Sequence, residues 1–207
     1  MLMGEYSAIM QSLYATIAVS EQNGSALDEV VDLLAEGSLT RERFDGIVGQ
    51  SSNIESRQFR DGLLDLLLHS LRTAVRDHCI TQDEMLFVRH LTSIFRIREG
   101  ELFERRGVEI SLILEAEFLR MLDDERVDSF ELAYQDALQR LFGLGYDQFL
   151  DVVRQAYTPI VDRAILAATT DGAASRTQRA ELDRRLSALS TIYVLSAAQR
   201  AALEHVP

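Results

Sequence analysis

Residues that break helices are scarce in this chain, and this constrains its fold more than any other feature. Only two of its 207 residues are proline, Pro159 and Pro207, and only 11 are glycine. A β-sandwich or β-barrel needs turn residues about every ten positions, so the composition excludes these classes. Apolar residues make up 47% of the chain, enough to fill a sizeable core. We expect an all-α protein with no sheet, in which helix covers more than about 65% of the chain.

Apolar residues recur at helical spacing along the whole chain, as in Leu27, Val30, Val31 and Leu34. Pro159 suits the first turn of a helix, where no N–H is needed, and so is expected to begin one. The expected helices are an N-terminal one ending near Asn23, then 25–35, 40–48, 53–76, 81–95, 99–106, 108–122, 129–142, 146–157, 159–169, 177–189 and 196–204.

One loop divides the predicted helices into two groups. The segment 49–53 carries glycine, serine and asparagine and is the best loop candidate in the first half of the chain. We expect an N-terminal helical subdomain over 1–52 and a larger helical bundle over 53–207. The helix after this loop is apolar on more than one face, which indicates a central helix packed on several sides.

Three predicted turns share a pattern and are separated by a constant 47 residues. An aspartate follows an apolar helix, and Thr81, Asp128 or Ser175 then stands where the next helix begins. Such residues cap helices, and an acid or amide three residues later completes a capping box. The repeat predicts a compact bundle of helix–turn–helix hairpins with internal pseudo-symmetry, in which Thr81, Asp128 and Ser175 are equivalent N-caps. Pseudo-symmetry would also place Asp77 near Asp171.

At these turns the chain resembles the TerB-like family of tellurite-resistance proteins. In that family an apolar helix is followed by Asp-Gly, an aliphatic residue, Ser or Thr, and a glutamate. This motif occurs twice, and the two copies lie on the order of ninety residues apart. The resemblance covers residues 53–204, and Asp77 and Asp171 stand at the positions of the two motif aspartates. Asp171-Gly172 matches the Asp-Gly of the motif directly. The chain departs from the pattern at His78, in place of glycine, and at Gln178, in place of an acid. The resemblance implies a bacterial, non-enzymatic, all-α protein of stress response or defence, with divalent-metal binding through the acids of the turns.

Clustered carboxylates at the turns are the candidate metal ligands. Hard cations such as calcium or magnesium prefer oxygen ligands, which acidic turns supply. The alternative is that these acids cap and solvate helix ends. The candidate ligands are Asp77, Glu84, Asp124, Asp128, Glu131 and Asp171.

The charge balance limits the partners of the chain. It carries 33 acidic and 21 basic residues, a net charge of -12. Nucleic acids and anionic membranes select basic surfaces, so we expect neither as a partner. No apolar stretch is long enough to cross a membrane, and no basic segment precedes an apolar one at the N-terminus, so a cytoplasmic location is expected.

No catalytic arrangement is recognisable. The chain has no glycine-rich phosphate loop, no nucleophile elbow and no paired metalloprotease histidines. The leading hypothesis is a non-enzymatic binding or scaffold module that acts through a protein partner or through self-association. A divalent-cation sensor and an enzyme of unrecognised type are the alternatives.

Overall fold

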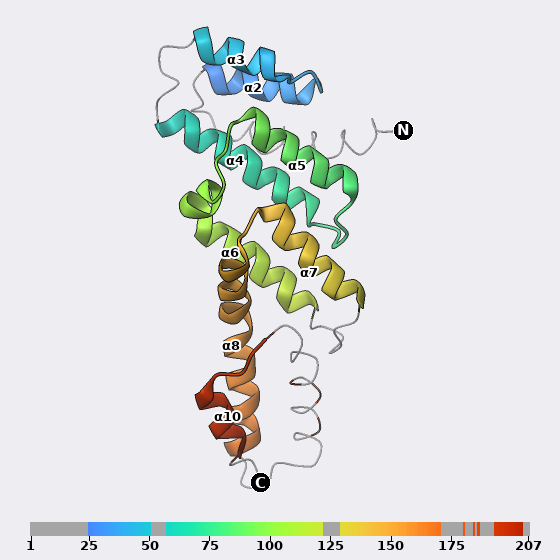
Figure 1. Cartoon of the computed structure of the whole chain (residues 1–207), viewed down its shortest axis with the longest axis vertical. Helices are drawn as coiled ribbons and strands as arrows, with labels where there is room; N and C mark the ends of the chain where they lie inside the picture. Colours follow the sequence, from blue (N-terminus) through green and yellow to red (C-terminus); the bar gives the residue numbers. More distant parts are fainter. Residues whose placement is uncertain are drawn as a thin grey trace. The chain divides into compact units, whose positions relative to one another are not determined.

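The computed structural model describes residues 25–50, 57–121, 129–170, 180, 184, 186 and 193–204. Helix accounts for 82% of the described residues and strands for none, so the all-α prediction is confirmed. The helices of this described part, drawn in Figure 1, are α2 (Ser25–Ala35), α3 (Arg41–Gln50), α4 (Arg57–Ala74), α5 (Gln82–Ile94), α6 (Glu101–Met121), α7 (Ser129–Phe142), α8 (Tyr146–Thr170) and α10 (Ala197–Glu204).

The chain forms two compact units, residues 1–107 and 108–207. The predicted division into 1–52 and 53–207 falls within 51–56, outside the described residues, and stays a prediction. The expected helices before residue 24 and over 177–189 also lie largely outside them.

The first unit packs α2 and α5 against the leucine-rich helix α4, and α3 against α2. Figure 1 shows α2 beside α3, and α4 paired with α5. The helix α4 contacts both α2 and α5, as expected of a helix that is apolar on several faces. It buries Leu63, Leu64, Leu66, Leu67, Leu68, Ser70, Leu71 and Ala74.

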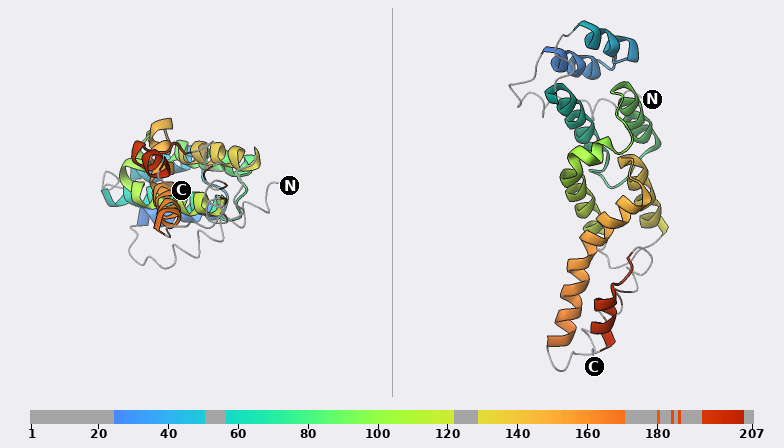
Figure 2. Two further views of the ribbon diagram at one scale, coloured as in Figure 1. Left: turned by 90° about the horizontal axis from the view of Figure 1, so that it is seen from below. Right: turned by 60° about the vertical axis from the view of Figure 1, so that its left-hand side comes forward.

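In the second unit, α8 is the longest helix and packs along α10. Figure 2 shows these two helices side by side in a second orientation. Phe118 of α6 contacts two rings of α8, with ring centres 5.5 Å from Phe149 and 5.8 Å from Tyr157. These rings, all nearly inaccessible to water, form the centre of the unit.

Partly buried polar contacts attach α10 to α8. The carbonyl oxygen of the Gln199 side chain accepts from the Tyr193 hydroxyl at 2.9 Å and from the Ser196 N–H at 2.9 Å. Its amide nitrogen donates to Asp162 of α8 at 2.7 Å. The hydroxyl of Ser196 in turn accepts from the Gln199 N–H, so a capping box opens α10 where the sequence predicts a helix from residue 196.

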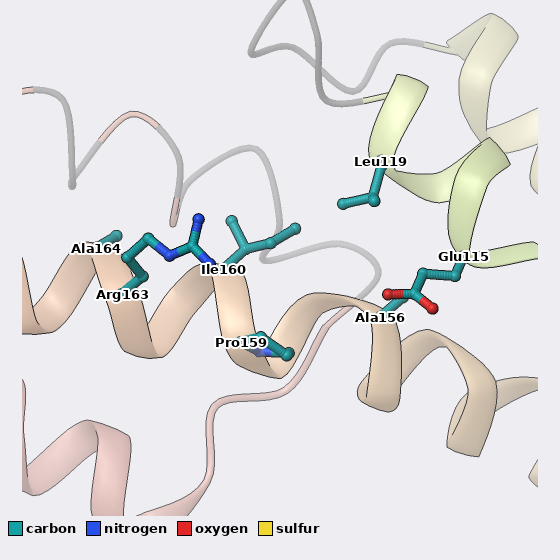
Figure 3. Close-up of a pocket in the computed structure, with 7 residues that line it drawn as sticks. All are labelled: Glu115, Leu119, Ala156, Pro159, Ile160, Arg163 and Ala164. Carbon is teal, nitrogen blue, oxygen red and sulfur yellow. The ribbon is translucent and has the colours of Figure 1, made fainter. Parts of the chain in front are cut away.

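Two predictions about helix boundaries have opposite outcomes. The backbone of Arg106 leaves the helical region at φ -133 and ψ 25, so the predicted break between 99–106 and 108–122 is confirmed as a kink within α6. The prediction that Pro159 begins a new helix is wrong, because α8 continues through it. Proline has no N–H to donate to the carbonyl of Gln155, so the helix lacks one hydrogen bond there. In Figure 3 the turn of the ribbon between Ala156 and Pro159 is correspondingly wide. Burial of Val153, Tyr157 and Val161 on the same helix keeps it continuous.

A glycine permits the close approach of α2 to α4. A Cβ atom on Gly62 would overlap Cδ2 of the buried Leu27, whereas one on Gly46, in α3, would meet no atom within 4 Å. Both glycines lie inside helices, so they form a matched pair.

We predict opposite effects of alanine at these two positions. Gly46→Ala should raise the free energy of unfolding by about 0.5–1 kcal/mol, because alanine restricts the unfolded chain. Gly62→Ala should lower it by about 1–2 kcal/mol, because Leu27 must move. Urea unfolding followed by circular dichroism measures both, and equal gains in stability would contradict the close packing of α2 on α4.

Candidate functional site

The first repeated turn is a helix cap built by its own residues. The Thr81 hydroxyl accepts from the Glu84 N–H at 3.2 Å, and the Glu84 carboxylate accepts from the Thr81 N–H at 2.8 Å. This capping box confirms Thr81 as the N-cap of α5. The carboxylate of Asp77 accepts from the Cys79 N–H at 3.1 Å, so it closes the turn.

His78 lies in the left-handed region of backbone conformation, at φ 60. Glycine adopts this conformation without cost, whereas other residues lose about 1–2 kcal/mol. The TerB-like pattern has glycine at this position. The turn therefore places a non-glycine residue in a backbone conformation that favours glycine.

The structure places only some of the candidate metal ligands. Asp77 and Glu84 hold the turn before α5, and Glu131 lies in the first turn of α7. Asp124, Asp128 and Asp171 lie outside the described residues, as does Ser175, so the pseudo-symmetry and the proximity of Asp77 to Asp171 stay predictions. Among the residues that are described, no three His, Cys, Asp or Glu side chains form a group that could hold a metal ion.

We predict that the first turn acts as a cap whether or not a divalent cation is present. Thr81→Ala should lower the free energy of unfolding by about 1 kcal/mol, because the helix loses its cap.

A cation bound by the folded protein would raise the melting temperature by mass action. Thermal melts of the native protein and of Asp77→Asn, with and without millimolar calcium or magnesium, test this. A rise in the native protein that Asp77→Asn abolishes would show that the turn binds metal.

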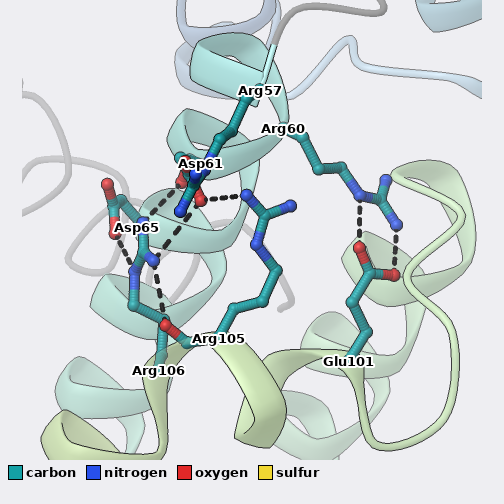
Figure 4. A network of polar contacts seen from close by, with 7 residues as sticks. All are labelled: Arg57, Arg60, Asp61, Asp65, Glu101, Arg105 and Arg106. Carbon is teal, nitrogen blue, oxygen red and sulfur yellow. Dashed lines mark hydrogen bonds and ion pairs between the residues drawn. The ribbon is translucent and has the colours of Figure 1, made fainter.

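A two-pronged ion pair in the first unit joins Arg60 of α4 to Glu101 of α6. Two guanidinium nitrogens donate to the two carboxylate oxygens at 2.7 and 2.6 Å (Figure 4). The same guanidinium donates to the carbonyls of Phe95 at 2.6 Å and Arg96 at 2.9 Å, at the C-terminal end of α5. A cation at this end of a helix satisfies free carbonyls and interacts favourably with the helix dipole.

Beside this pair, a second cluster connects the same two helices. Asp61 accepts from Arg105 at 2.6 Å, and Asp65 accepts from Arg106 at 2.7 Å. The non-helical backbone of Arg106 coincides with these contacts, and its guanidinium also donates to the carbonyl of Asp61. Figure 4 shows both clusters converging on one end of α4. Every charged group in them has a partner, so their arrangement suits structural attachment of the helices.

The ion pair with Arg60 lowers the pKa of Glu101 from 4.5 to about 2, against the opposing effect of burial. The ionised carboxylate therefore stabilises the folded form fully above about pH 4.5, and this contribution is lost as pH falls towards 2.

We predict that Glu101→Gln lowers the free energy of unfolding at neutral pH by about 3 kcal/mol, because Arg60 loses its charged partner. The difference from the native protein should shrink as pH falls from 4.5 towards 2, where Glu101 itself becomes neutral. Urea unfolding across this range measures it. Glu99→Gln, at an exposed neighbour, is the control and should be nearly neutral. A difference that does not depend on pH would contradict the role of the charge.

A hollow of about 420 Å³ lies in the second unit, between α6 and α8. Figure 3 shows its lining, which is mostly apolar and includes one carboxylate and one guanidinium. The lining residues are Glu115, Leu119, Ala156, Pro159, Ile160, Arg163 and Ala164. Those of α8 recur at i, i+3, i+4, i+7 and i+8, so they form one face of that helix.

An outward stripe of α6 runs along the same side. Val108, Leu112, Glu115 and Leu119 are spaced by four, three and four residues, the spacing of a coiled-coil seam. The exposed fractions of the three apolar residues are 73%, 59% and 40%. Sequence reasoning missed this surface, although the spacing is visible in the sequence, because periodicity does not tell an outward stripe from an inward one.

The described groups with a clearly displaced pKa do not line the hollow. Of the described residues these are Glu101 and Tyr157, and neither lines it. Burial, together with the negative charge of Glu131, raises the pKa of Tyr157, whose hydroxyl donates to the carbonyl of Phe118 at 3.1 Å. Tyr157 thus acts as a packed core residue and not as an acid–base group.

Comparisons with protein-family models, with curated proteins and with solved structures yield no match to this chain. Within the described helices, no segment combines the length and the apolar character that crossing a membrane requires.

Proposed function

We propose that the chain is a non-enzymatic helical binding or scaffold module that acts through protein contacts, and that the face formed by α6 and α8 is its contact surface. The observation that carries this proposal is the exposure of Val108, Leu112 and Leu119 in one stripe beside an apolar hollow. Single exposed apolar residues are ordinary, whereas a continuous stripe rimmed by polar groups is typical of interaction sites. We name this surface, Val108, Leu112, Glu115 and Leu119 of α6 with Pro159, Ile160 and Arg163 of α8, the α6/α8 face.

The chemistry of the hollow supports binding in preference to catalysis. Its charged residues are one carboxylate and one guanidinium, Glu115 and Arg163, and it contains no nucleophile paired with a base. A groove between two helices instead suits the apolar side of a third helix. The TerB-like resemblance extends the proposal to a cytoplasmic bacterial protein of stress response or defence.

We predict that a photoreactive benzoylphenylalanine in place of Leu112 forms covalent adducts with protein when the chain is expressed in cells. The same group in place of Asp136, which is exposed on α7, should form few or none. Gel electrophoresis and mass spectrometry of the adducts measure both. Equal labelling from the two positions, or none from either, would contradict the α6/α8 face as a protein-binding surface.

A further inference from the structure

The charges of the α6/α8 face have opposite signs at its two ends. In Figure 3, Glu115 lies at one end of the hollow and Arg163 towards the other, with Leu119 and Ile160 between them. Neither charged side chain forms an ion pair within the described part of the chain. As far as the described residues show, the face therefore presents an apolar centre with a free anion on one side and a free cation on the other.

A surface of this kind is complementary to itself. Rotation by a half turn about an axis through its centre exchanges the acidic end with the basic end. In a two-fold dimer the interface is formed by the same surface patch of both chains. Each acid then meets a base, and the central apolar residues meet each other. We propose, on the basis of the protein-binding role argued above, that the α6/α8 face binds the same face of a second copy, with Glu115 of each chain paired with Arg163 of the other.

The charge pattern favours a second copy over an unrelated partner. A strongly basic segment would meet Arg163, and a strongly acidic one would meet Glu115, so either would bring like charges together. Only a partner with both signs in reversed order satisfies both ends, and a second copy carries that order by symmetry. The net charge of -12 opposes association at long range, but physiological salt screens charges beyond about 8 Å and leaves the close pairs effective.

The apolar centre supplies the attraction, and the charged ends set the orientation. Leu112, Leu119 and Ile160 would lose contact with water on association, which is favourable in proportion to the area buried. The two ion pairs fix the relative orientation of the copies, because a shift along the helices places the charges against apolar side chains.

The test is a charge exchange followed by sedimentation of the full chain over a range of concentrations. The native protein should approach twice the mass of a single chain as its concentration rises. Glu115→Arg and Arg163→Glu should each weaken association at least about tenfold, because each places like charges together at two symmetric positions. The variant that carries both substitutions restores opposite charges and should recover most of the association. Asp136→Arg, on α7, is the control and should leave it unchanged.

Each result of this experiment supports the dimer or overturns it. Circular dichroism identifies any charge-reversal variant that fails to fold. In that case Glu115→Gln or Arg163→Gln replaces the unfolded variant and should weaken association less than a reversal would. The proposed dimer is overturned if the native chain stays monomeric at every concentration. It is also overturned if the single reversals leave the dimer intact, or if the variant with both substitutions does not recover association. If the dimer is overturned but the photoreactive group at position 112 labels a different protein, the α6/α8 face is still a protein-binding surface. The dimer and the proposed function can therefore be rejected independently.

Discussion

The ion pair between Arg60 and Glu101 is the contact on which the first unit depends. One guanidinium satisfies a buried carboxylate and two carbonyls at the end of α5, so it holds α4, α5 and the start of α6 together. The α5–α6 corner that it fixes includes Arg96, a non-glycine residue at φ 52. Such a backbone persists only where its surroundings hold it, and here the Arg60 guanidinium and the Asp45 carboxylate both bind Arg96. Because this ion pair is partly buried, removing either member leaves the other charge unpaired and destabilises the unit.

The sequence predicts the parts of this protein that depend on local chemistry. Thr81 and Glu84 are three residues apart, and their mutual hydrogen bonds follow from that spacing alone. The central position of α4 follows in the same way from its many leucines. Pro159 shows the limit of local rules, because tertiary packing of α8 keeps a helix continuous where proline alone favours a start.

The contacts that pair distant residues could not be predicted from one sequence. Arg60 and Glu101 are 41 residues apart, and nothing near either position identifies the other as its partner. The α6/α8 face is similar, because its helical spacing is readable but the side on which it lies is set by the core around Phe118 and Tyr157. The candidate metal ligands Asp124, Asp128 and Asp171 lie outside the described residues, so the cation hypothesis stays a prediction.

On the proposal made above, the α6/α8 face is where this chain binds protein, with its own copy as the first partner. The most direct measurement is a dilution series of methyl NMR spectra with leucine and isoleucine labelled. We expect the methyl resonances of Leu112, Leu119 and Ile160 to move with concentration, while those of Leu64 and Leu67, buried in the other unit, stay fixed. Resonances of Leu112, Leu119 and Ile160 that do not move, in a chain that does associate, would contradict it.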